Sequence, residues 1–373
     1  MKKILIGTLA FVILTACSQI QKATDVITNP TAREVYARNF SEENVQYQQW
    51  KTAFEAGKRD SLAISLPYLE SGQYQYPNRN AHSYNIDLQE GEQLQVKVMK
   101  DVDSVHVFID LFKLSEGQLQ QKPLAQAEEN ETQLTFEAKE TAAYKLIIQP
   151  EMEANTPFQV SVFTQPTFGF PVAGKGNKDI QSYWGATRDG GRRSHEGVDI
   201  FAPRGTPVVA ATDGRVSSTG NRGLGGNQVW LREGLFGGSL YYAHLDSIIA
   251  IRGQRVKKGD TLGLVGNSGN ARTTAPHLHF GIYKGYSGAI NPLPFIEQKD
   301  IPNLGEPFSS KVAAVTRNKA ELRLGPSTSF TQIASLQQKD TVEILGKTGN
   351  WFHIQPSDSL KGFMHRSLLK VSP

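Results

Sequence analysis

Between residues 62 and 165 the chain alternates apolar and polar positions, which is the period of a half-buried β-strand. The alternation recurs in five short stretches: Tyr84-Ile86-Leu88, Leu94-Val96-Val98, Val105-Val107-Ile109, Tyr144-Leu146-Ile148 and Phe158-Val160-Val162. Turn-forming residues such as Glu90-Gly91-Glu92 separate the stretches. Many short strands joined by turns predict an antiparallel β-sandwich.

The segment before this region has a helical period instead. Three aromatic residues recur at spacings of three and four: Tyr47, Trp50 and Phe54. Ser41 offers an N-cap and Gly57 supplies a stop. These features predict one amphipathic helix over 42–56, whose aromatic stripe packs into a core.

The first residues have the layout of a secretory signal. Lys2 and Lys3 precede an apolar run that ends at Leu14 and is too short for a permanent membrane-spanning helix. The sequence Leu14-Thr15-Ala16-Cys17 resembles a bacterial lipobox, which implies that Cys17 is lipidated and becomes the mature N-terminus. Because Cys17 is the only cysteine, the chain has no disulfide framework and no thiolate metal site. A plain signal peptide with an incidental cysteine is the alternative.

Acyl chains on Cys17 would attach the protein durably to a membrane, through a polar tether expected over residues 17–40. Ser18 follows the cysteine. In Gram-negative lipoproteins a residue other than Asp at this position implies the outer membrane, facing the periplasm. The formal net charge of only +4 gives no case for nucleic-acid binding.

A candidate metal site begins in SHEGVDI, residues 194–200. His195 and Glu196 match the start of the helical zinc signature H-E-x-x-H, but the fifth position is Asp199. Gly197 interrupts a helix, and the β-branched residues that follow favour a strand. On a strand, residues four apart share a face, so His195 and Asp199 point the same way while Glu196 points away.

A second cluster of histidines lies in APHLHFGIY. His277 and His279 would share one face of a strand, with Leu278 on the other. Two histidines and a carboxylate leave a fourth position open on a tetrahedral zinc, which is the arrangement of a catalytic site. His244, in LYYAHLDSI, lies in another apolar strand pattern and adds a spare imidazole.

The order of these residues resembles the lysostaphin-like (LytM-type) zinc metallopeptidases, which cut peptidoglycan peptides. GTPVVAATDGRV, GGNQVWL, RVKKGDTLGLVGNSGN and INPLPFI also have counterparts in that family. The resemblance implies that one Zn²⁺ per chain is bound by His195, Asp199 and His279. His244 and His277 would be the catalytic pair. All five residues are present, unlike in degenerate relatives that have lost the metal and act as amidase activators.

The resemblance covers about residues 168–297, with two departures. Arg232-Glu233 stands where many relatives have Asp-His, and Gly281 stands where many have Glu after HLHF. Neither position is a metal ligand in the family, so the departures concern substrate preference and groove lining. Four residues precede the first ligand where the family's groove has one wall, and the sequence assigns them no role: Tyr183, Trp184, Arg192 and Arg193.

The chemistry implied by the resemblance needs no glutamate base. Zinc lowers the pKa of bound water from 15.7 toward about 7. An unperturbed imidazole exchanges protons near that pH, so one of His244 and His277 would take the water proton and the other would donate to the oxyanion. The sequence leaves open which histidine does which.

The C-terminal stretch resembles a bacterial SH3-like barrel. The resemblance rests on Leu322 to Ser327, Gly349-Asn350-Trp351 and Gly362-Phe363. That family often binds cell-wall peptide or glycan and targets an attached hydrolase. The alternative is a barrel that packs against, or partly covers, the catalytic groove. His353 and His365 are expected to be incidental.

The sequence therefore predicts a mainly β chain with an N-terminal helix and antiparallel β-sandwich, an antiparallel LytM-type peptidase domain and a small SH3-like barrel. The expected divisions are a signal peptide (1–16), a lipidated tether (17–40), the helix and sandwich (41–165), the zinc metallopeptidase domain (166–298), a linker (299–311) and the SH3-like domain (312–373).

The expected function is zinc-dependent hydrolysis of amide bonds in peptidoglycan cross-links, for wall growth, remodelling or separation. In a Gram-negative cell the bond would join D-Ala to meso-diaminopimelate. The alternative is a non-hydrolytic or autoinhibited wall-binding regulator that activates an amidase or a divisome partner.

Overall fold

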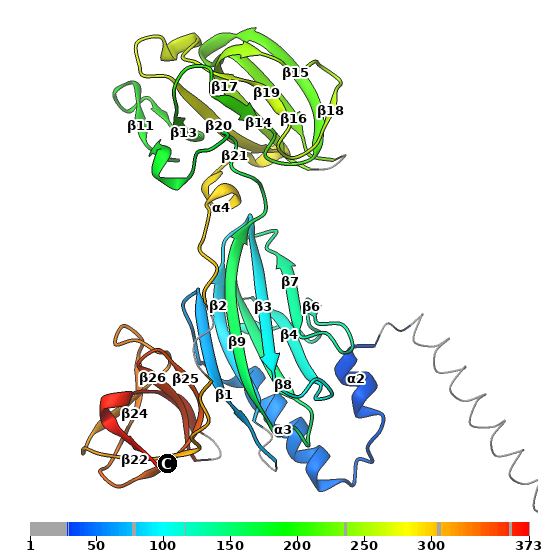
Figure 1. The fold of residues 1–373 in the computed structure, drawn as a ribbon, viewed down its shortest axis with the longest axis vertical. Helices are drawn as coiled ribbons and strands as arrows, with labels where there is room; N and C mark the ends of the chain where they lie inside the picture. Colours follow the sequence, from blue (N-terminus) through cyan, green and yellow to red (C-terminus); the bar gives the residue numbers. More distant parts are fainter. Residues whose placement is uncertain are drawn as a thin grey trace, which may run out of the picture.

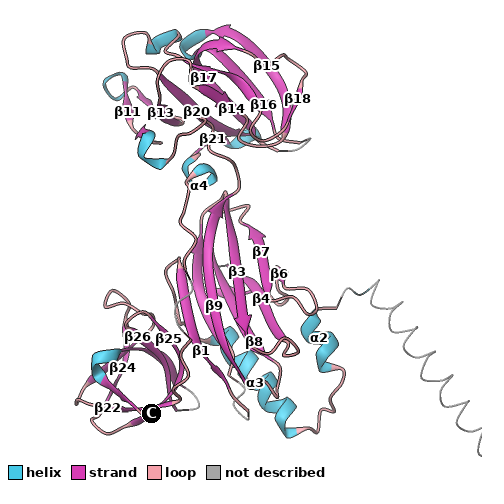
Figure 2. Cartoon of the chain, in the orientation of Figure 1, coloured by secondary structure: helices cyan, strands magenta, loops and turns pink. Residues whose placement is uncertain are grey.

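The computed structural model describes residue 28 and residues 30–76, 80–115, 117–234, 237–303, 307–357 and 360–372. The expected signal peptide and Cys17 lie outside the described residues, so the lipid anchor stays a prediction. Within the described part, no helix is long and apolar enough to cross a bilayer. Antiparallel strands dominate the chain (Figure 2), which confirms the mainly β fold class.

The N-terminal domain is a sandwich of two antiparallel sheets. The strands of the first sheet, in spatial order, are β1 (Tyr68–Tyr74), β9 (Thr156–Pro166), β3 (Glu92–Lys100) and β7 (Gln133–Glu137). Those of the second are β2 (His82–Leu88), β8 (Ala142–Pro150) and β4 (Val107–Ser115), with the short strands β5 (Gln118–Leu119) and β6 (Ala125–Gln126) beside β4.

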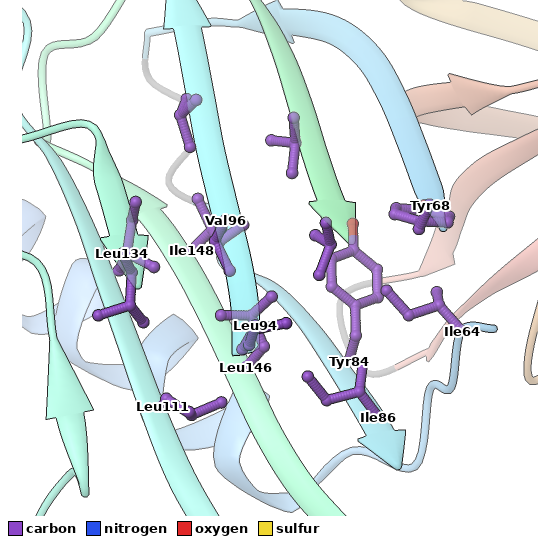
Figure 3. Close-up of a cluster of buried hydrophobic side chains, with 14 of the residues drawn as sticks. Ile64, Tyr68, Tyr84, Ile86, Leu94, Val96, Leu111, Leu134, Leu146 and Ile148 are labelled. Atoms are coloured by element: carbon purple, nitrogen blue, oxygen red, sulfur yellow. The ribbon is translucent and has the colours of Figure 1, made fainter. Parts of the chain in front are cut away.

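The core of this domain lies between the two sheets (Figure 3). The residues of the predicted alternation fill it, and several are at most 2% exposed: Tyr84, Ile86, Leu94, Val96, Leu146 and Ile148. Burying an aliphatic or aromatic side chain of this size contributes about 1.5–3 kcal/mol. The inward face of each strand therefore fixes its register, as the sequence pattern predicts.

Two helices, α2 (Ala32–Ala37) and α3 (Val45–Arg59), precede the sandwich, and α3 packs against β8 and β2. The predicted helix over 42–56 thus begins and ends three residues later than expected. Asn44 caps it in place of Ser41, because its side chain accepts hydrogen bonds from two main-chain amides. Gly57 lies inside the helix, where a Cβ would come within 3.3 Å of Ser83. The lack of a side chain at Gly57 allows the helix to pack closely against Ser83, and it does not end the helix.

The polar segment before α3 folds from Thr31 onward, although the sequence predicts a tether to about residue 40. Thr31 and Glu34 form a capping box. Arg33 is buried and donates two hydrogen bonds to Asp110, at 2.8 and 3.0 Å. Its guanidinium also lies 3.9 Å from the ring centre of Phe54. One arginine therefore anchors α2 to the sandwich. The polar sequence around it does not predict this contact.

The central domain is built on a ten-stranded antiparallel sheet. Its main path runs β10 (Ile180–Ser182), β13 (Val198–Phe201), β20 (His277–Lys284), β17 (Ser239–Ile248), β16 (Gly226–Arg232), β15 (Gly214–Arg222) and β18 (Arg255–Val256). The strands off this path are β14 (Pro207–Val209), β19 (Thr261–Val265) and β21 (Gly288–Ile290).

A separate hairpin and several short helices surround this sheet. The hairpin pairs β11 (Thr187–Arg188) with β12 (Arg193–Ser194). The 3-10 helices are η1 (Asn177–Asp179), η2 (Asp189–Gly191), η3 (Gly223–Gly225), η4 (Gly269–Ala271) and η5 (Gly285–Ser287).

The short helix α4 (Leu293–Ile296) joins the central domain to one end of the sandwich (Figure 1). The Phe295 ring packs against Gly91, whose φ is +95° and where a Cβ would lie 2.5 Å from the ring. Phe168 donates its main-chain N–H to the carbonyl of Phe295 at 2.8 Å. Lys284 and Glu90 form an ion pair of 2.5 Å across the same junction.

The C-terminal barrel packs against the sandwich and lies away from the central domain (Figure 1). Its elements are β22 (Val312–Val315), β23 (Ala320–Arg323), β24 (Gln332–Leu336), β25 (Thr341–Thr348), β26 (Trp351–Ser357), β27 (Leu360–His365), η6 (Arg366–Leu368) and β28 (Leu369–Val371). Strand β25 pairs with β1 at Ser71 and Lys347. The two domains therefore share one continuous sheet.

A buried polar cluster lies where the barrel meets the sandwich. Glu70 has no exposed side-chain surface, and its Oε1 accepts a hydrogen bond from His353 Nδ1 at 3.0 Å. Its Oε2 accepts from the hydroxyls of Tyr68, at 2.7 Å, and Tyr84. Gly346 makes room for this carboxylate, because a Cβ there would collide with it. The expectation that His353 is incidental is wrong: it is fully buried and joins two domains.

Candidate metal centre

Three of the predicted ligands meet on the central sheet. His195 Nε2, Asp199 Oδ1 and His279 Nδ1 lie 3.0 Å apart in each pairing. Asp199 and His279 are directly opposite each other in the β13–β20 ladder, which brings together residues 80 positions apart in the chain. All three side chains are at most 15% exposed.

The chain reaches this arrangement by a bend and not by the continuous strand that the spacing predicts. Strand β12 ends at Ser194 and β13 begins at Val198, so His195 lies between strands. A Cβ on Gly197 would come within 2.7 Å of the His279 ring, so glycine is needed for the close approach. Glu196 is exposed, and its carboxylate faces the Tyr283 hydroxyl at 3.5 Å and not the three ligand atoms.

Asp199 is an ionised carboxylate within this group. Burial alone would raise the pKa of Asp199, but its contacts with His195 and His279 hold that pKa well below the usual range. His195 Nδ1 lies 2.9 Å from the carbonyl oxygen of Tyr183, and because a carbonyl only accepts, this nitrogen carries a proton. Nε2 is therefore the nitrogen of His195 that a metal can use, and it faces Asp199 Oδ1 at 3.0 Å.

The negative charge of this carboxylate, beside two imidazole nitrogens, suits a cation. Two imidazole nitrogens and a carboxylate oxygen are a donor set that zinc accepts, and ligands about 2.0–2.1 Å from a tetrahedral zinc lie about 3.3 Å apart. The three atoms belong to a group whose spacing could hold a metal ion. The residues present therefore fit the expected zinc.

The second oxygen of Asp199 is held by a residue to which the sequence gives no role. Arg188 donates to Asp199 Oδ2 at 2.8 Å and to Ser182 Oγ at 2.6 Å. Outer contacts of this kind fix the orientation of a metal ligand. The sequence could not reveal the pair, because an arginine 11 positions from an aspartate carries no pattern of its own.

The remaining two histidines lie beside the ligand group. On β20, Leu278 is fully buried in the core while His277 faces the other side, as the alternation predicts. The His277 ring lies 5.1 Å from that of His244, which in turn lies 5.9 Å from the His279 ring, centre to centre. His244 has a φ of +63°, a left-handed conformation that is uncommon for a residue with a side chain and is found at functional sites.

Both of these imidazoles are oriented by main-chain carbonyls. His244 Nδ1 lies 2.9 Å from the oxygen of Ser268, and His277 Nδ1 lies 2.8 Å from that of Ala275. Each Nδ1 therefore carries a proton, and each neutral ring presents the lone pair of Nε2. Burial, and then the neighbouring His277 and His279, lower the pKa of His244 to about 4.

These residues line a hollow of about 890 Å³. Its lining includes the arginines of the β11–β12 hairpin and four residues of η3 and η4: Leu224, Gly225, Asn270 and Ala271. Every described lining residue lies between Gln181 and Tyr283. Among the residues that the structure describes, neither the sandwich nor the barrel therefore covers the hollow.

Two parts of the chain match known families. Residues 193–292 match peptidase family M23, and residues 318–370 match the bacterial SH3 domain. A stretch of 123 residues is 39% identical to L-Ala--D-Glu endopeptidase of Bacillus subtilis (strain 168), which covers 31% of this chain and 37% of that protein. A stretch of 89 residues is 42% identical to peptidoglycan DD-endopeptidase ShyA of Vibrio cholerae, which covers 23% of this chain and 19% of that protein.

The chain thus spans less than two fifths of the length of these relatives. Among solved structures, the catalytic domain of lysostaphin from Staphylococcus simulans is 34% identical over 32% of this chain and 92% of that domain, with a TM-score of 0.29. The two family matches confirm the resemblances drawn from the sequence.

Proposed function

We propose that this chain is a zinc-dependent endopeptidase that hydrolyses peptide cross-links of peptidoglycan, because residues 193–292 match peptidase family M23 and residues 318–370 match the bacterial SH3 domain. The observation that carries the proposal is the convergence of His195, Asp199 and His279 at 3.0 Å, with two further imidazoles beside them, in an uncovered hollow. Relatives named L-Ala--D-Glu endopeptidase and peptidoglycan DD-endopeptidase support the substrate class.

Zinc would be held by His195, Asp199 and His279, and when bound it would polarise the scissile carbonyl and lower the pKa of a water molecule. Arg188 keeps Asp199 in place through Oδ2 and so leaves Oδ1 for the metal. The Tyr183 carbonyl fixes the ring of His195.

His244 and His277 move the protons in this proposal. Both rings hold their Nδ1 proton on a main-chain carbonyl, so their Nε2 atoms are free to accept a proton from the attacking water. Once protonated, the same Nε2–H donates to the developing oxyanion or to the leaving nitrogen. Glu196 takes no part, because its carboxylate lies beside Tyr283.

We further propose that the bond cut is the D-Ala to meso-diaminopimelate cross-link. The similarity to a peptidoglycan DD-endopeptidase supports this choice. Cys17 would anchor the chain to the outer membrane through lipid, with the catalytic domain facing the periplasm. The SH3 domain would contribute contacts to the wall. The complete ligand set and the uncovered hollow do not favour the non-hydrolytic regulator.

Digestion of purified sacculi by the full chain, with mass spectrometry of the released fragments, tests the proposal. The wild type should open cross-links, and both the chelated protein and His279→Ala should not. His106→Ala, which removes a partly buried imidazole from the sandwich, is the matched control and should behave as wild type. Sacculi left intact by the zinc-loaded wild type would contradict the proposed activity.

A further inference from the structure

The β11–β12 hairpin places arginines along one wall of the hollow. Its ladder pairs Thr187 with Ser194 and Arg188 with Arg193. The pairing continues past the strands, because His195 donates its main-chain N–H to the carbonyl of Ala186 at 2.9 Å. The hairpin therefore leads directly into the first metal ligand.

The register fixes the face on which Arg193 lies. Residues directly opposite each other in an antiparallel ladder project to the same face. Arg188 donates to Asp199 at 2.8 Å, so this face looks into the hollow. Arg193 is also two positions before His195, a spacing that shares a face in extended chain. Its presence among the lining residues agrees with both arguments.

The charges on this wall favour an anion. Arg188 and Arg193 lie directly opposite each other in the ladder, which places two guanidinium groups on one face of the hairpin. Arg188 donates to Asp199, and Arg192 and Arg193 are exposed residues of the hollow's lining. Among the described lining residues, these three arginines outnumber the carboxylates of Glu196 and Asp199. The described lining residues that come from η3 and η4 carry no charge.

We propose that Arg193, flanked by Arg192, binds a carboxylate of the substrate peptide next to the scissile amide, an inference that rests on the proposed function. A guanidinium matches a carboxylate with two parallel hydrogen bonds, which gives direction as well as affinity. In a D-Ala to diaminopimelate bond, the carbon that bears the amide nitrogen also bears a free carboxylate. An internal glycine bridge has none, so this subsite would select the class of cross-link.

The test uses three cross-linked peptides and the zinc-loaded full chain. The first peptide keeps all its carboxylates. The second is amidated only at the carboxylate beside the scissile nitrogen, and the third only at the carboxylates of the acyl-donor stem. We expect the wild type to cleave the first and third peptides about 10- to 100-fold more efficiently than the second, as for a hydrogen-bonded charged pair. A loss of cleavage confined to the third peptide would contradict the assignment.

Arg193→Gln should bring that ratio close to one, mainly through KM, and should keep the same zinc content as the wild type. Arg215→Gln is the matched control, because Arg215 is an exposed arginine outside the hollow and loses the same charge. It should keep the wild-type ratio. Equal cleavage of all three peptides by the wild type would overturn the inference and leave the proposed function standing. An unchanged ratio in Arg193→Gln would overturn the role of Arg193.

A binding measurement keeps the two proposals separable. If no peptide and no sacculus is cleaved, the proposed function fails, and calorimetry of the chelated protein with the three peptides still decides the subsite. Weaker binding of the second peptide than of the first and third to the wild type, and equal binding of all three to Arg193→Gln, would support the carboxylate subsite. Equal affinities of the wild type for all three would refute it.

Discussion

Glu70 offers the sharpest test of how the barrel is held on the sandwich. Its carboxylate accepts hydrogen bonds from Tyr68, Tyr84 and His353 and is fully buried. Glu70→Gln keeps the size of the side chain but replaces one accepting oxygen with an amide group that donates. At least one of the three buried donors then loses its partner.

The expected cost follows from these contacts. A hydrogen bond to a charged group contributes about 1.5–3 kcal/mol, and a buried polar group left without a partner costs about 1–3 kcal/mol. Because glutamine keeps one acceptor, we expect a loss of about 2–4 kcal/mol in the free energy that holds β1 and β25 together. A factor of ten per 1.36 kcal/mol converts this loss to about 30- to 1,000-fold faster amide exchange.

Hydrogen exchange with mass spectrometry is the suitable assay, since a chain of three domains need not unfold in one step. Peptides over β1 and β25 should lose protection at pH 7.5, while peptides over β20 should not. Glu321→Gln is the control, because Glu321 pairs with Arg323 on the barrel with 47% of its side chain exposed. A surface pair of this kind contributes about 0–1 kcal/mol. Exchange in Glu70→Gln within about threefold of the wild type would refute the reasoning.

The pH dependence of this effect has a defined sign. Burial alone would raise the pKa of Glu70, but His353 and His82 beside it hold that pKa well below the usual range. The folded form therefore binds its proton more weakly than the unfolded chain, whose glutamates titrate near about 4.3. The stabilisation is present above that pH and is lost as the pH falls toward the folded pKa. The difference between wild type and Glu70→Gln should shrink over the same range.

Three further outcomes can be measured. Asp199→Ala should lose bound zinc in elemental analysis, whereas Glu196→Gln should keep the metal and most of the activity, because only Asp199 lies among the ligand atoms. Burial lowers the pKa of Lys361 from 10.5 to about 8. The unfolded chain then binds more protons at this residue between these values, so the resistance of the wild type to urea, relative to that of Lys361→Met, should rise with pH from about 8 to 10.5. Gly346→Ala should speed exchange in β25 by about 5- to 150-fold, because overpacking of about 1–3 kcal/mol follows from a Cβ that meets the Glu70 carboxylate.

The sequence predicts the sandwich well because each strand buries one face. The inward residues of β2, β3 and β8 must be apolar and the outward ones need not be. The resulting alternation along each strand therefore predicts the strand without knowledge of its partner. The ligand group is predictable for a different reason. His195 and Asp199 lie close in the chain, and the resemblance to a known family supplies His279.

Contacts between distant polar residues could not be predicted. His353 lies 283 positions from Glu70, and no local sequence pattern around either residue predicts the contact. Arg33 likewise donates to a buried partner, Asp110, which lies 77 positions away in the chain. The segment around Arg33 has the polar composition of a tether, so it does not predict this contact. The bend at Gly197 also escapes a strand-based argument, because the reason for the glycine is the His279 ring beside it.

The shared sheet has a consequence for shortened versions of the protein. Strand β1 is paired on one side by β9 and on the other by β25, so removing the chain from Val312 onward would leave one edge of β1 open. An unpaired edge is a template for another chain, and such edges promote aggregation. The same cut would expose the Glu70 carboxylate. Aggregation of a truncated protein would therefore reflect the open edge of β1. A loss of wall binding on truncation can be interpreted only when the truncated protein is soluble and monodisperse.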